Sequence, residues 1–332
     1  MLRYETVGFY GNDNFMRSKT IFLKPVGDAC NLHCRYCFEN GGRRNHHFHP
    51  LMLQETIDFL TDYKNFDHLF IVFHGGEPLL SPKTYIDDIL KYISKNFFRR
   101  CNVQIQTNAV LLDDEWLKLL YPYRAFLSLS ASCDPLGDID LRTGVDVRLR
   151  NKIICNVQNA LKIFRNVGIV SVMHRFNKNA FEEYLKELIR YGICNWSISR
   201  VRAYKSDVAY LSESEYDEVL IRLAKVWIQE KLYKKIRIQP LNALMGKENK
   251  ICIYMHKPDK CFEFITFAPS GIFGRCYHLP QNKMPSLSEK CKDCRILYFC
   301  GGGCVAENND EDFCVGRKKL HRFVEEIKNE DK

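Results

Sequence analysis

The sequence of 332 residues lacks any apolar run that approaches the roughly 20 residues needed to cross a bilayer as a helix. Its amino-terminal residues, MLRYETVGFYGNDNF, lack the apolar core and the cleavage site of a secretion signal. The chain also lacks low-complexity segments and long internal repeats. These absences exclude a membrane-spanning protein and predict a cytoplasmic globular chain.

The net charge of +9 does not by itself indicate a nucleic-acid partner. The basic residues are spread along the chain, as in Lys231, Lys234 and Lys235 or the short run Arg43-Arg44. Such a distribution is typical of a solvated basic surface. Attraction of an acidic peptide substrate is the more specific alternative, and we expect no nucleic-acid or membrane partner.

Cysteine is unusually abundant, with fifteen residues. A disulfide scaffold is not expected, because the chain is long, has an odd number of cysteines and carries no secretion signal. In a reducing compartment, thiols that are clustered in the sequence more often hold metal.

Between residues 20 and 231, short apolar or β-branched runs alternate with longer helical patterns. The expected strands are Thr20–Leu23, Leu69–Phe73, Asn102–Gln106, Phe126–Ala131, Ile169–Met173 and Trp196–Ser199, and the expected helices lie near 50–64, 82–97, 113–121, 147–166, 179–191 and 212–231. Six successive strand–helix units predict an α/β fold with a parallel sheet, either open or curled into a partial barrel. Ligands of such folds lie at the carboxyl ends of the strands.

Capping signals in the sequence predict where two of these helices begin. Asn179 with Glu182, and Ser212 with Glu215, both fit the capping box that begins a helix. In the last helix an apolar stripe recurs at helical spacing, which predicts core packing rather than a cofactor site.

The pattern changes after residue 231. From Cys252 to Cys314, eight of 63 residues are cysteine, among glycines and turns. A small domain with few apolar side chains can be held together by metal instead. We therefore expect an N-terminal segment at 1–19, a core domain at 20–235 and a cysteine-rich domain at 236–332 that ends in a helix.

The first metal motif directly follows the first expected strand. It reads Gly27-Asp28-Ala29-Cys30-Asn31-Leu32-His33-Cys34-Arg35-Tyr36-Cys37, with the spacing C-x3-C-x2-C. Iron–sulfur clusters are normally held by four thiolates, so three close thiolates leave one iron of a cubane open. An open metal position is what a catalytic site requires. Zinc, or a cluster closed by a distant cysteine, is the alternative.

This motif resembles that of the radical S-adenosylmethionine (radical SAM) enzymes. The resemblance implies a partial (β/α)6 barrel of radical SAM type and a [4Fe–4S] cluster at Cys30, Cys34 and Cys37. In the family, the open iron chelates the amino and carboxylate groups of S-adenosylmethionine. Reductive cleavage of that cofactor then yields a 5′-deoxyadenosyl radical that abstracts hydrogen from the substrate. By the same resemblance, Tyr36 packs near the adenine.

Further cofactor contacts are expected after later strands. Phe73-His74-Gly75-Gly76-Glu77-Pro78 resembles the family's GGEP motif, which binds the cofactor's ammonium group. Glycines let the backbone approach a ligand, and a carboxylate can pair with a cation. Asn108 and Ser130 are polar residues at the next two strand ends, which suit contacts to the ribose and carboxylate, and Ser130 is the better candidate. Relatives often have Asp-Gly after the fourth strand, whereas this chain reads Ser132-Cys133-Asp134.

The carboxy-terminal cysteines form a second array. It resembles the seven-cysteine SPASM domain of a radical SAM subfamily, through Cys261, Gly271, Cys276, Cys291, Cys294, Cys300, Cys304 and Cys314. The resemblance implies two auxiliary [4Fe–4S] clusters, one on Cys261, Cys276 and Cys304, and the other on Cys291, Cys294, Cys300 and Cys314. Cys252 is the candidate eighth ligand, or else an ordinary buried thiol. Zinc is the competing metal.

Subfamily members with this domain mostly modify peptides or proteins. We expect a maturase that installs a crosslink or similar modification in a ribosomally made peptide, with a flavodoxin or ferredoxin as electron donor. Fewer than 20 residues precede the first strand, too few for the winged-helix leader-recognition domain of many such maturases. Anaerobic sulfatase maturation, radical modification of a small molecule, and a non-catalytic metal or electron-transfer protein are the alternatives.

The residues after Cys276 bear on the sulfatase alternative. In sulfatase-maturing relatives an aspartate follows the matching cysteine and acts as a base, whereas this chain has Tyr277 and His278. A tyrosine with a pKa near 10 is a poor base at neutral pH, whereas histidine is largely neutral there. We therefore expect Tyr277 or His278 to contact a different substrate side chain; packing beside the auxiliary cluster is the other interpretation.

Overall fold

The computed structural model describes residues 17–37, 39, 52–142, 147–203, 205–246, 258–274, 276, 286–304 and 311–330. A single nine-stranded sheet, in the order β7-β6-β5-β4-β3-β2-β1-β8-β9, organises these residues. The strands are β1 Ser18–Leu23, β2 His68–Phe73, β3 Cys101–Thr107, β4 Leu127–Ser132, β5 Val167–Met173, β6 Asn195–Arg200, β7 Arg237–Gln239, β8 Phe264–Ala268 and β9 Gly271–Phe273. All neighbours pair in parallel except β8 and β9.

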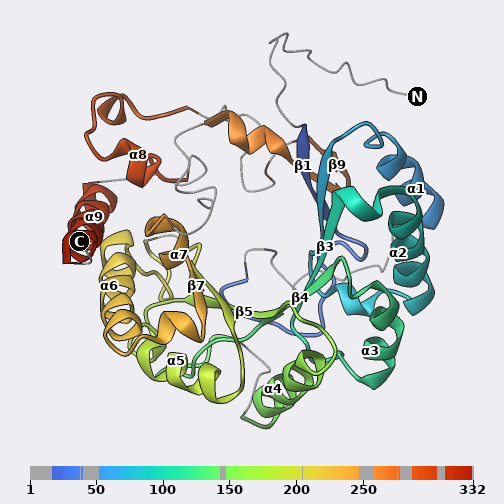
Figure 1. The fold of residues 1–332 in the computed structure, drawn as a ribbon, viewed down its shortest axis with the longest axis horizontal. Coiled ribbons are helices and arrows are strands. Elements are labelled where there is room, and N and C mark those ends of the chain that lie inside the picture. The colour runs from blue at the N-terminus through green and yellow to red at the C-terminus, as the bar shows by residue number, and fades with distance from the viewer. Residues whose placement is uncertain are drawn as a thin grey trace.

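Helices follow each of the first six strands. They are α1 Leu53–Thr61, α2 Lys83–Phe97, α3 Asp114–Leu120, α4 Val147–Leu161, α5 Phe181–Arg190 and α6 Glu213–Gln229, joined later by α7 Leu241–Leu244, α8 Leu297–Cys300 and α9 Glu311–Glu330. In Figure 1 the helices α1 to α6 form the outer ring, and the curved sheet lies inside it. The sheet ends at β7 and β9 without closing, so the predicted α/β fold and partial barrel are confirmed.

The two faces of the sheet differ in polarity, as strand alternation requires. In β3 the side chains of Val103 and Ile105 are fully buried, whereas Gln104 and Gln106 on the other face are half-buried. The apolar face packs against helices such as α2, whose buried residues include Ile86, Ile89 and Ile93. The outer face therefore holds the main core, and the inner face keeps polar groups available for a ligand.

The helix signals in the sequence are partly confirmed. Ser212 accepts a hydrogen bond from the Glu215 backbone N–H, and the Glu215 side chain accepts one from the Ser212 N–H, which completes the capping box of α6. The box expected at Asn179 is wrong. Helix α5 begins after Ala180, which makes no side-chain cap. Burial of its apolar face, including Phe181 and Tyr184, places the start of this helix.

Strands β7, β8 and β9 come from the segment after residue 235 and are not predicted by the sequence pattern. Each has only three to five residues, too few to give a clear period. Strand β7 pairs with β6, whereas β8 pairs with β1 at the other end of the sheet. The carboxy-terminal part of the chain therefore extends both ends of the barrel sheet.

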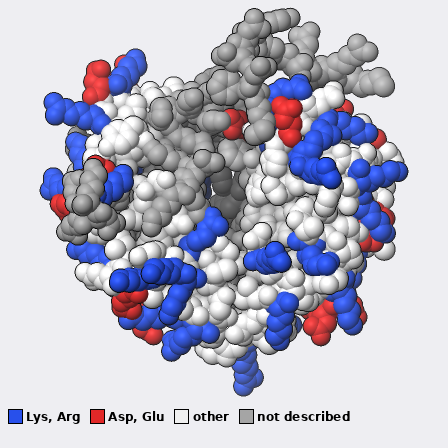
Figure 2. Space-filling model, in the orientation of Figure 1, with Lys and Arg blue, Asp and Glu red and all other residues white. Residues whose placement is uncertain are grey.

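The surface carries its positive charge in a dispersed form. Figure 2 shows Lys and Arg side chains distributed around the visible face, with fewer Asp and Glu among them. Several cations are paired, as in Arg222–Glu182 at 2.7 Å and Lys319–Glu218 at 2.7 Å. Among the described helices, none combines the length and apolar character that crossing a bilayer requires.

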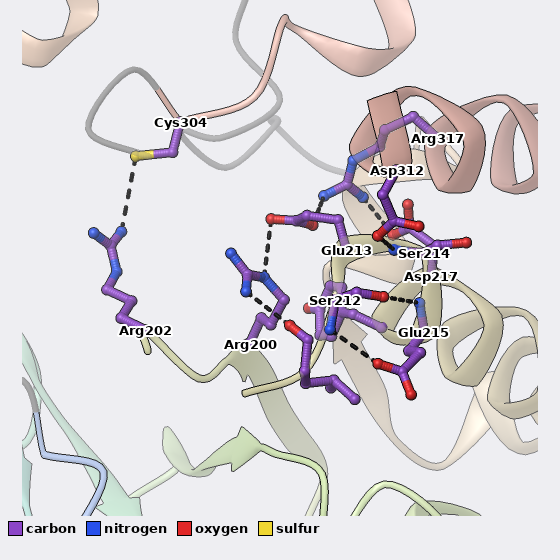
Figure 3. Close-up of polar contacts among 12 residues, drawn as sticks. Arg200, Arg202, Ser212, Glu213, Ser214, Glu215, Asp217, Cys304, Asp312 and Arg317 are labelled. Atoms are coloured by element: carbon purple, nitrogen blue, oxygen red, sulfur yellow. Dashed lines mark hydrogen bonds and ion pairs between the residues drawn. The ribbon is translucent and has the colours of Figure 1, made fainter. Parts of the chain in front are cut away.

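Helix α9 is fixed to α6 by a buried ion pair. The guanidinium of Arg317 lies 2.6 Å from a carboxylate oxygen of Asp217 and 3.1 Å from Glu213. Figure 3 shows Arg317 directed toward these residues of α6. Arg317 is 1% exposed and Asp217 is fully buried. The neighbouring Gly316 permits this close approach, because a Cβ there would lie 2.8 Å from the Ser214 Cα. Burial raises the pKa of Asp217 to about 7, although Arg317 opposes the shift.

We predict that Arg317→Met lowers the free energy of unfolding by about 3–5 kcal/mol, because it leaves Asp217 without its buried partner. Adding Asp217→Asn to that variant restores part of the loss, since the uncompensated carboxyl group is then removed. Anaerobic urea unfolding followed by circular dichroism measures both effects.

Arg222→Met is the matched control, because Arg222 lies on α6, as Asp217 does, and forms a more exposed ion pair, with Glu182 of α5. We expect a change of less than about 1 kcal/mol for that variant. Equal destabilisation by Arg317→Met and Arg222→Met would contradict the anchoring role of the buried pair.

Candidate active site

The first cysteine motif lies in the loop that follows β1, at the carboxyl edge of the sheet. Burial raises the pKa of the Cys34 thiol to about 12, and nearby Cys37 and Cys30 contribute to that rise. Burial also raises the pKa of Cys30, with Cys37 again adding to the effect. Cys30 and Cys34 therefore both lie within electrostatic range of Cys37.

The loop after β2 packs directly on this cysteine loop. The Gly76 N–H donates to the Gly27 carbonyl at 2.9 Å, and the Glu77 N–H donates to the Ala29 carbonyl at 2.8 Å. A Cβ on Gly75 would lie 2.3 Å from the Gly27 oxygen, and a Cβ on Gly76 only 1.9 Å from the Ala29 oxygen. Both positions therefore require glycine for the approach of two backbones.

Glu77 is fully buried and satisfies groups on the neighbouring strand. Its carboxylate accepts hydrogen bonds from the Thr107 hydroxyl at 2.7 Å, the Asn108 N–H at 2.7 Å and the Leu79 N–H at 2.9 Å. Burial raises the pKa of Glu77 to about 6, and these three hydrogen bonds limit the rise. The contact of this carboxylate with the ammonium group of S-adenosylmethionine stays a prediction. The hydrogen bonds that Glu77 makes in the structure hold the end of β3.

Asn108 joins that end of β3 to the cysteine loop. Its amide nitrogen donates to the Asn31 side chain at 2.7 Å and lies 3.7 Å from the Cys30 sulfur. Its amide oxygen accepts the Val110 N–H at 3.0 Å, which fixes the orientation of the side chain. Four sequence-predicted residues, Gly75, Gly76, Glu77 and Asn108, therefore meet around the loop that carries Cys30.

On the other side of the loop, Tyr36 is held by Asp134, a charged residue for which no motif predicts a role. Its hydroxyl donates to Asp134, which also accepts the Val172 N–H at 2.9 Å and lies 3.4 Å from the Arg142 guanidinium. The ring of His174 lies 5.6 Å from that of Tyr36. Arg142 and His174 belong to no motif that the sequence shows. Only the fold brings them close to Tyr36.

A buried ion pair supports the cysteine loop from a third side. The Lys24 ammonium lies 2.7 Å from the Glu39 carboxylate, and His74 lies 3.8 Å from the same carboxylate. Burial lowers the pKa of His74 to about 3, and the charge of Lys24 acts in the same direction. The imidazole is therefore neutral at physiological pH, so it contributes no positive charge beside Glu39.

Ser130 lies on the inner face of the barrel, away from the loops described above. It lines a cavity of about 450 Å³ together with Gln104, Ser128, Ser197 and Gln239. The cavity extends toward the amino ends of the strands, where Asn102, Asn195 and Arg237 also line it. The predicted ribose contact of Ser130 stays a prediction, but its neighbours give the barrel interior a hydrogen-bonding surface.

Four cysteines of the second array surround a common cavity of about 380 Å³. They are Cys291, Cys294, Cys300 and Cys314, and Lys290, Arg317 and Lys318 line the same cavity. Cys314 and Cys294 contribute to the raised pKa of Cys291, where burial is the main cause. Within the described part of the chain, no three His, Cys, Asp or Glu side chains are arranged around a single metal ion. Four thiols around one cavity match the number of thiolates that normally hold a [4Fe–4S] cluster.

Of the remaining predicted ligands, the structure describes Cys261, Cys276 and Cys304. The Cys276 N–H donates to the Cys261 carbonyl at 2.8 Å, which brings these two ligands together. The Arg202 guanidinium lies 3.9 Å from the Cys304 sulfur (Figure 3). Cys252, Tyr277 and His278 lie outside the described residues.

Comparison with known proteins identifies the domain that carries this arrangement. Residues 25–188 match the Radical SAM superfamily. A cysteine-type anaerobic sulfatase-maturating enzyme of Clostridium novyi (strain NT) is 24% identical over 92% of this chain and 95% of its own length. A serine-type anaerobic sulfatase-maturating enzyme of Bacteroides thetaiotaomicron is 21% identical over 87% of this chain and 83% of its own length.

Solved structures show the same fold. Native anSMEcpe with bound AdoMet and Cp18Cys peptide has a TM-score of 0.69 at 17% identity, covering 95% of this chain and all of that one (100%). Streptococcus suis SuiB bound to S-adenosylmethionine has a TM-score of 0.63 at 15% identity, covering 90% of this chain and 77% of that one. The protein is therefore an enzyme that carries a radical SAM domain at residues 25–188 and is homologous to anaerobic sulfatase-maturating enzymes along most of its length.

Proposed function

We propose that this enzyme modifies a peptide or protein substrate, and that its product is a crosslinked or similarly altered ribosomal peptide. Cys30, Cys34 and Cys37 are the proposed ligands of the radical SAM cluster. When bound there, the cluster and S-adenosylmethionine supply a 5′-deoxyadenosyl radical that removes a hydrogen atom from the substrate. The observation that carries this proposal is the convergence of three thiols, the glycine loop and Asn108 at one edge of the sheet.

The chain's own residues have separable tasks in this proposal. Gly75 and Gly76 bring a second loop against the cysteine loop, whose Gly27 and Ala29 carbonyls accept hydrogen bonds from it. Asp134 and Arg142 fix the ring of Tyr36, the proposed adenine contact. Glu77 fixes Asn108 beside Cys30. Ser130 is the proposed ribose contact, from the inner face of β4.

The barrel interior supports a peptide as substrate. The residues that line its cavity include uncharged groups that donate and accept hydrogen bonds, such as Gln104, Ser128 and Ser197. Groups of this kind match backbone amides, which need a partner when they leave water. The relatives point the same way, since the solved anSMEcpe and SuiB structures include complexes with a Cp18Cys peptide and the precursor peptide SuiA.

We further propose a radical SAM core at residues 20–235 and an auxiliary domain at 236–332 with two [4Fe–4S] clusters. The cavity that Cys291, Cys294, Cys300 and Cys314 surround supports the second auxiliary site. The proximity of Cys261 to Cys276 supports the first. A low-potential flavodoxin or ferredoxin is the proposed electron donor.

Sulfatase maturation is the second candidate function, favoured by the similarity to the sulfatase-maturating enzyme of Clostridium novyi over 92% of this chain. The residues after Cys276 favour a different substrate, because Tyr277 and His278 stand where those relatives have the aspartate base. We propose that one of these two side chains contacts the substrate.

We predict that the anaerobically reconstituted chain binds about twelve irons, from three four-iron clusters. The triple variant Cys30→Ala, Cys34→Ala, Cys37→Ala retains about eight irons and no longer cleaves S-adenosylmethionine, because only the radical site is lost. Iron analysis and chromatography of 5′-deoxyadenosine measure the two effects. Cleavage by the triple variant would refute the assignment of the radical site.

We predict that Cys252→Ala destabilises the first auxiliary cluster, because Cys252 is its proposed eighth thiolate. The variant should lose up to about four irons and change the cluster spectrum. Cys155→Ala, which removes an exposed thiol on α4, is the matched control and should leave iron content unchanged. Full iron and an unchanged spectrum in Cys252→Ala would mean that this site is open or is ligated from elsewhere.

We predict that the reduced enzyme does not form formylglycine in a peptide that carries the sulfatase motif. The expected mass spectrum shows the unmodified cysteine or serine, because the aspartate base of sulfatase-maturing relatives is absent after Cys276. The same incubation must yield 5′-deoxyadenosine, which shows that the radical site is active. An aldehyde trapped as a hydrazone would decide for the alternative function.

A further inference from the structure

The segment that follows β6 connects the barrel to both groups of auxiliary cysteines. Arg200 ends β6, and Arg202 lies two residues further along the chain. From Arg200, ion pairs lead through Glu213 to Arg317 on α9, the helix that carries Cys314. From Arg202, a single contact reaches Cys304. Figure 3 shows the two arginines pointing to these different partners.

The backbone beneath Arg202 is held firmly. The Arg200 guanidinium lies 2.9 Å from the Glu213 carboxylate and donates to the Leu211 carbonyl at 2.9 Å. Val201 is fully buried, and its N–H donates to the Met173 carbonyl at 2.8 Å. Because the backbone at Arg202 is fixed, its guanidinium is held next to the Cys304 sulfur and can donate a hydrogen bond to it.

The chemistry of the contact is directional. A guanidinium has only N–H donors and remains charged, so at Cys304 it acts as donor and the sulfur as acceptor. When a cluster on this thiolate accepts one electron from an external reductant, the negative charge of the site grows by one. Hydrogen bonds to cluster sulfurs stabilise that added charge and are an established means of setting reduction potential.

We propose that Arg202 is a positioning residue of the first auxiliary site, where its hydrogen bond to the Cys304 thiolate raises the reduction potential of the cluster. This inference rests on the auxiliary clusters proposed above. The same contact ties the Cys304 loop to the end of β6, at the edge of the sheet where the radical cysteines lie. Arg202 thus links the reduction potential of the first auxiliary cluster to the position of the loop that follows β6.

The test is an anaerobic redox titration of the iron-loaded full-length chain, followed by electron paramagnetic resonance. We expect Arg202→Met to shift one of the three couples to a more negative potential, by up to a tenfold change in the equilibrium constant, or about 59 mV for one electron. Cys304→Ser identifies that couple, since it alters a ligand of the same cluster. Arg202→Lys keeps the charge and should recover much of the shift.

Arg222→Met is the matched control, because it removes one surface guanidinium from α6 and should leave all couples unchanged. Unchanged potentials in Arg202→Met with full iron would overturn the inference, as would an equal shift in Arg222→Met. If Arg202→Met loses about four irons, the Arg202→Lys variant decides the outcome. Retention of iron by Arg202→Lys supports the inference, whereas loss of iron from both variants overturns the proposed effect on the reduction potential. A wild-type content of about four irons would refute the auxiliary clusters themselves.

Discussion

The backbone contact between the loops after β1 and β2 is the constraint on which the site depends. Gly76 and Glu77 donate to carbonyls of Gly27 and Ala29, and no larger residue fits at position 75 or 76. The contact positions the cysteine loop, and the buried Glu77 carboxylate extends it to β3 through Asn108. Residues from three strand ends thereby form one rigid surface. A catalytic cluster with an open iron needs such a surface, because three ligands alone fix it poorly.

The strands have two roles, because their side chains point alternately to the outer and the inner face of the sheet. Their outer side chains build the apolar core against the helices, and polar inner side chains such as Gln104 and Ser128 help to line a cavity. This division lets the barrel be stable without filling its interior with apolar groups. The cost falls on polar side chains such as Gln104, which need hydrogen-bond partners when they leave water. A peptide that brings its own amides supplies partners of this kind, which is consistent with the proposed substrate.

The sequence predicts the repeated and motif-bearing parts of the molecule. All six strand–helix units lie within a few residues of their expected positions, because buried strands and amphipathic helices have clear periods. The cysteine spacings predict which thiols gather in one loop or one cavity. Strands β7, β8 and β9 are too short to be recognised, and the start of α5 is set by packing rather than by Asn179. Arg142 and Arg202 follow no motif, since only the folded sheet brings them to Tyr36 and Cys304.

One pairing in the sheet has a consequence for biosynthesis. Strand β1 lies between β2 and β8, and its register joins Thr20 to Phe264. Pairings between residues so distant in sequence form late, because a long loop must close before they are stabilised. While the ribosome is still making the middle of the chain, the strand that leads into Cys30 has only one of its two neighbours. The loop that carries Cys30 therefore follows a strand whose second neighbour forms only after β8 has been synthesised.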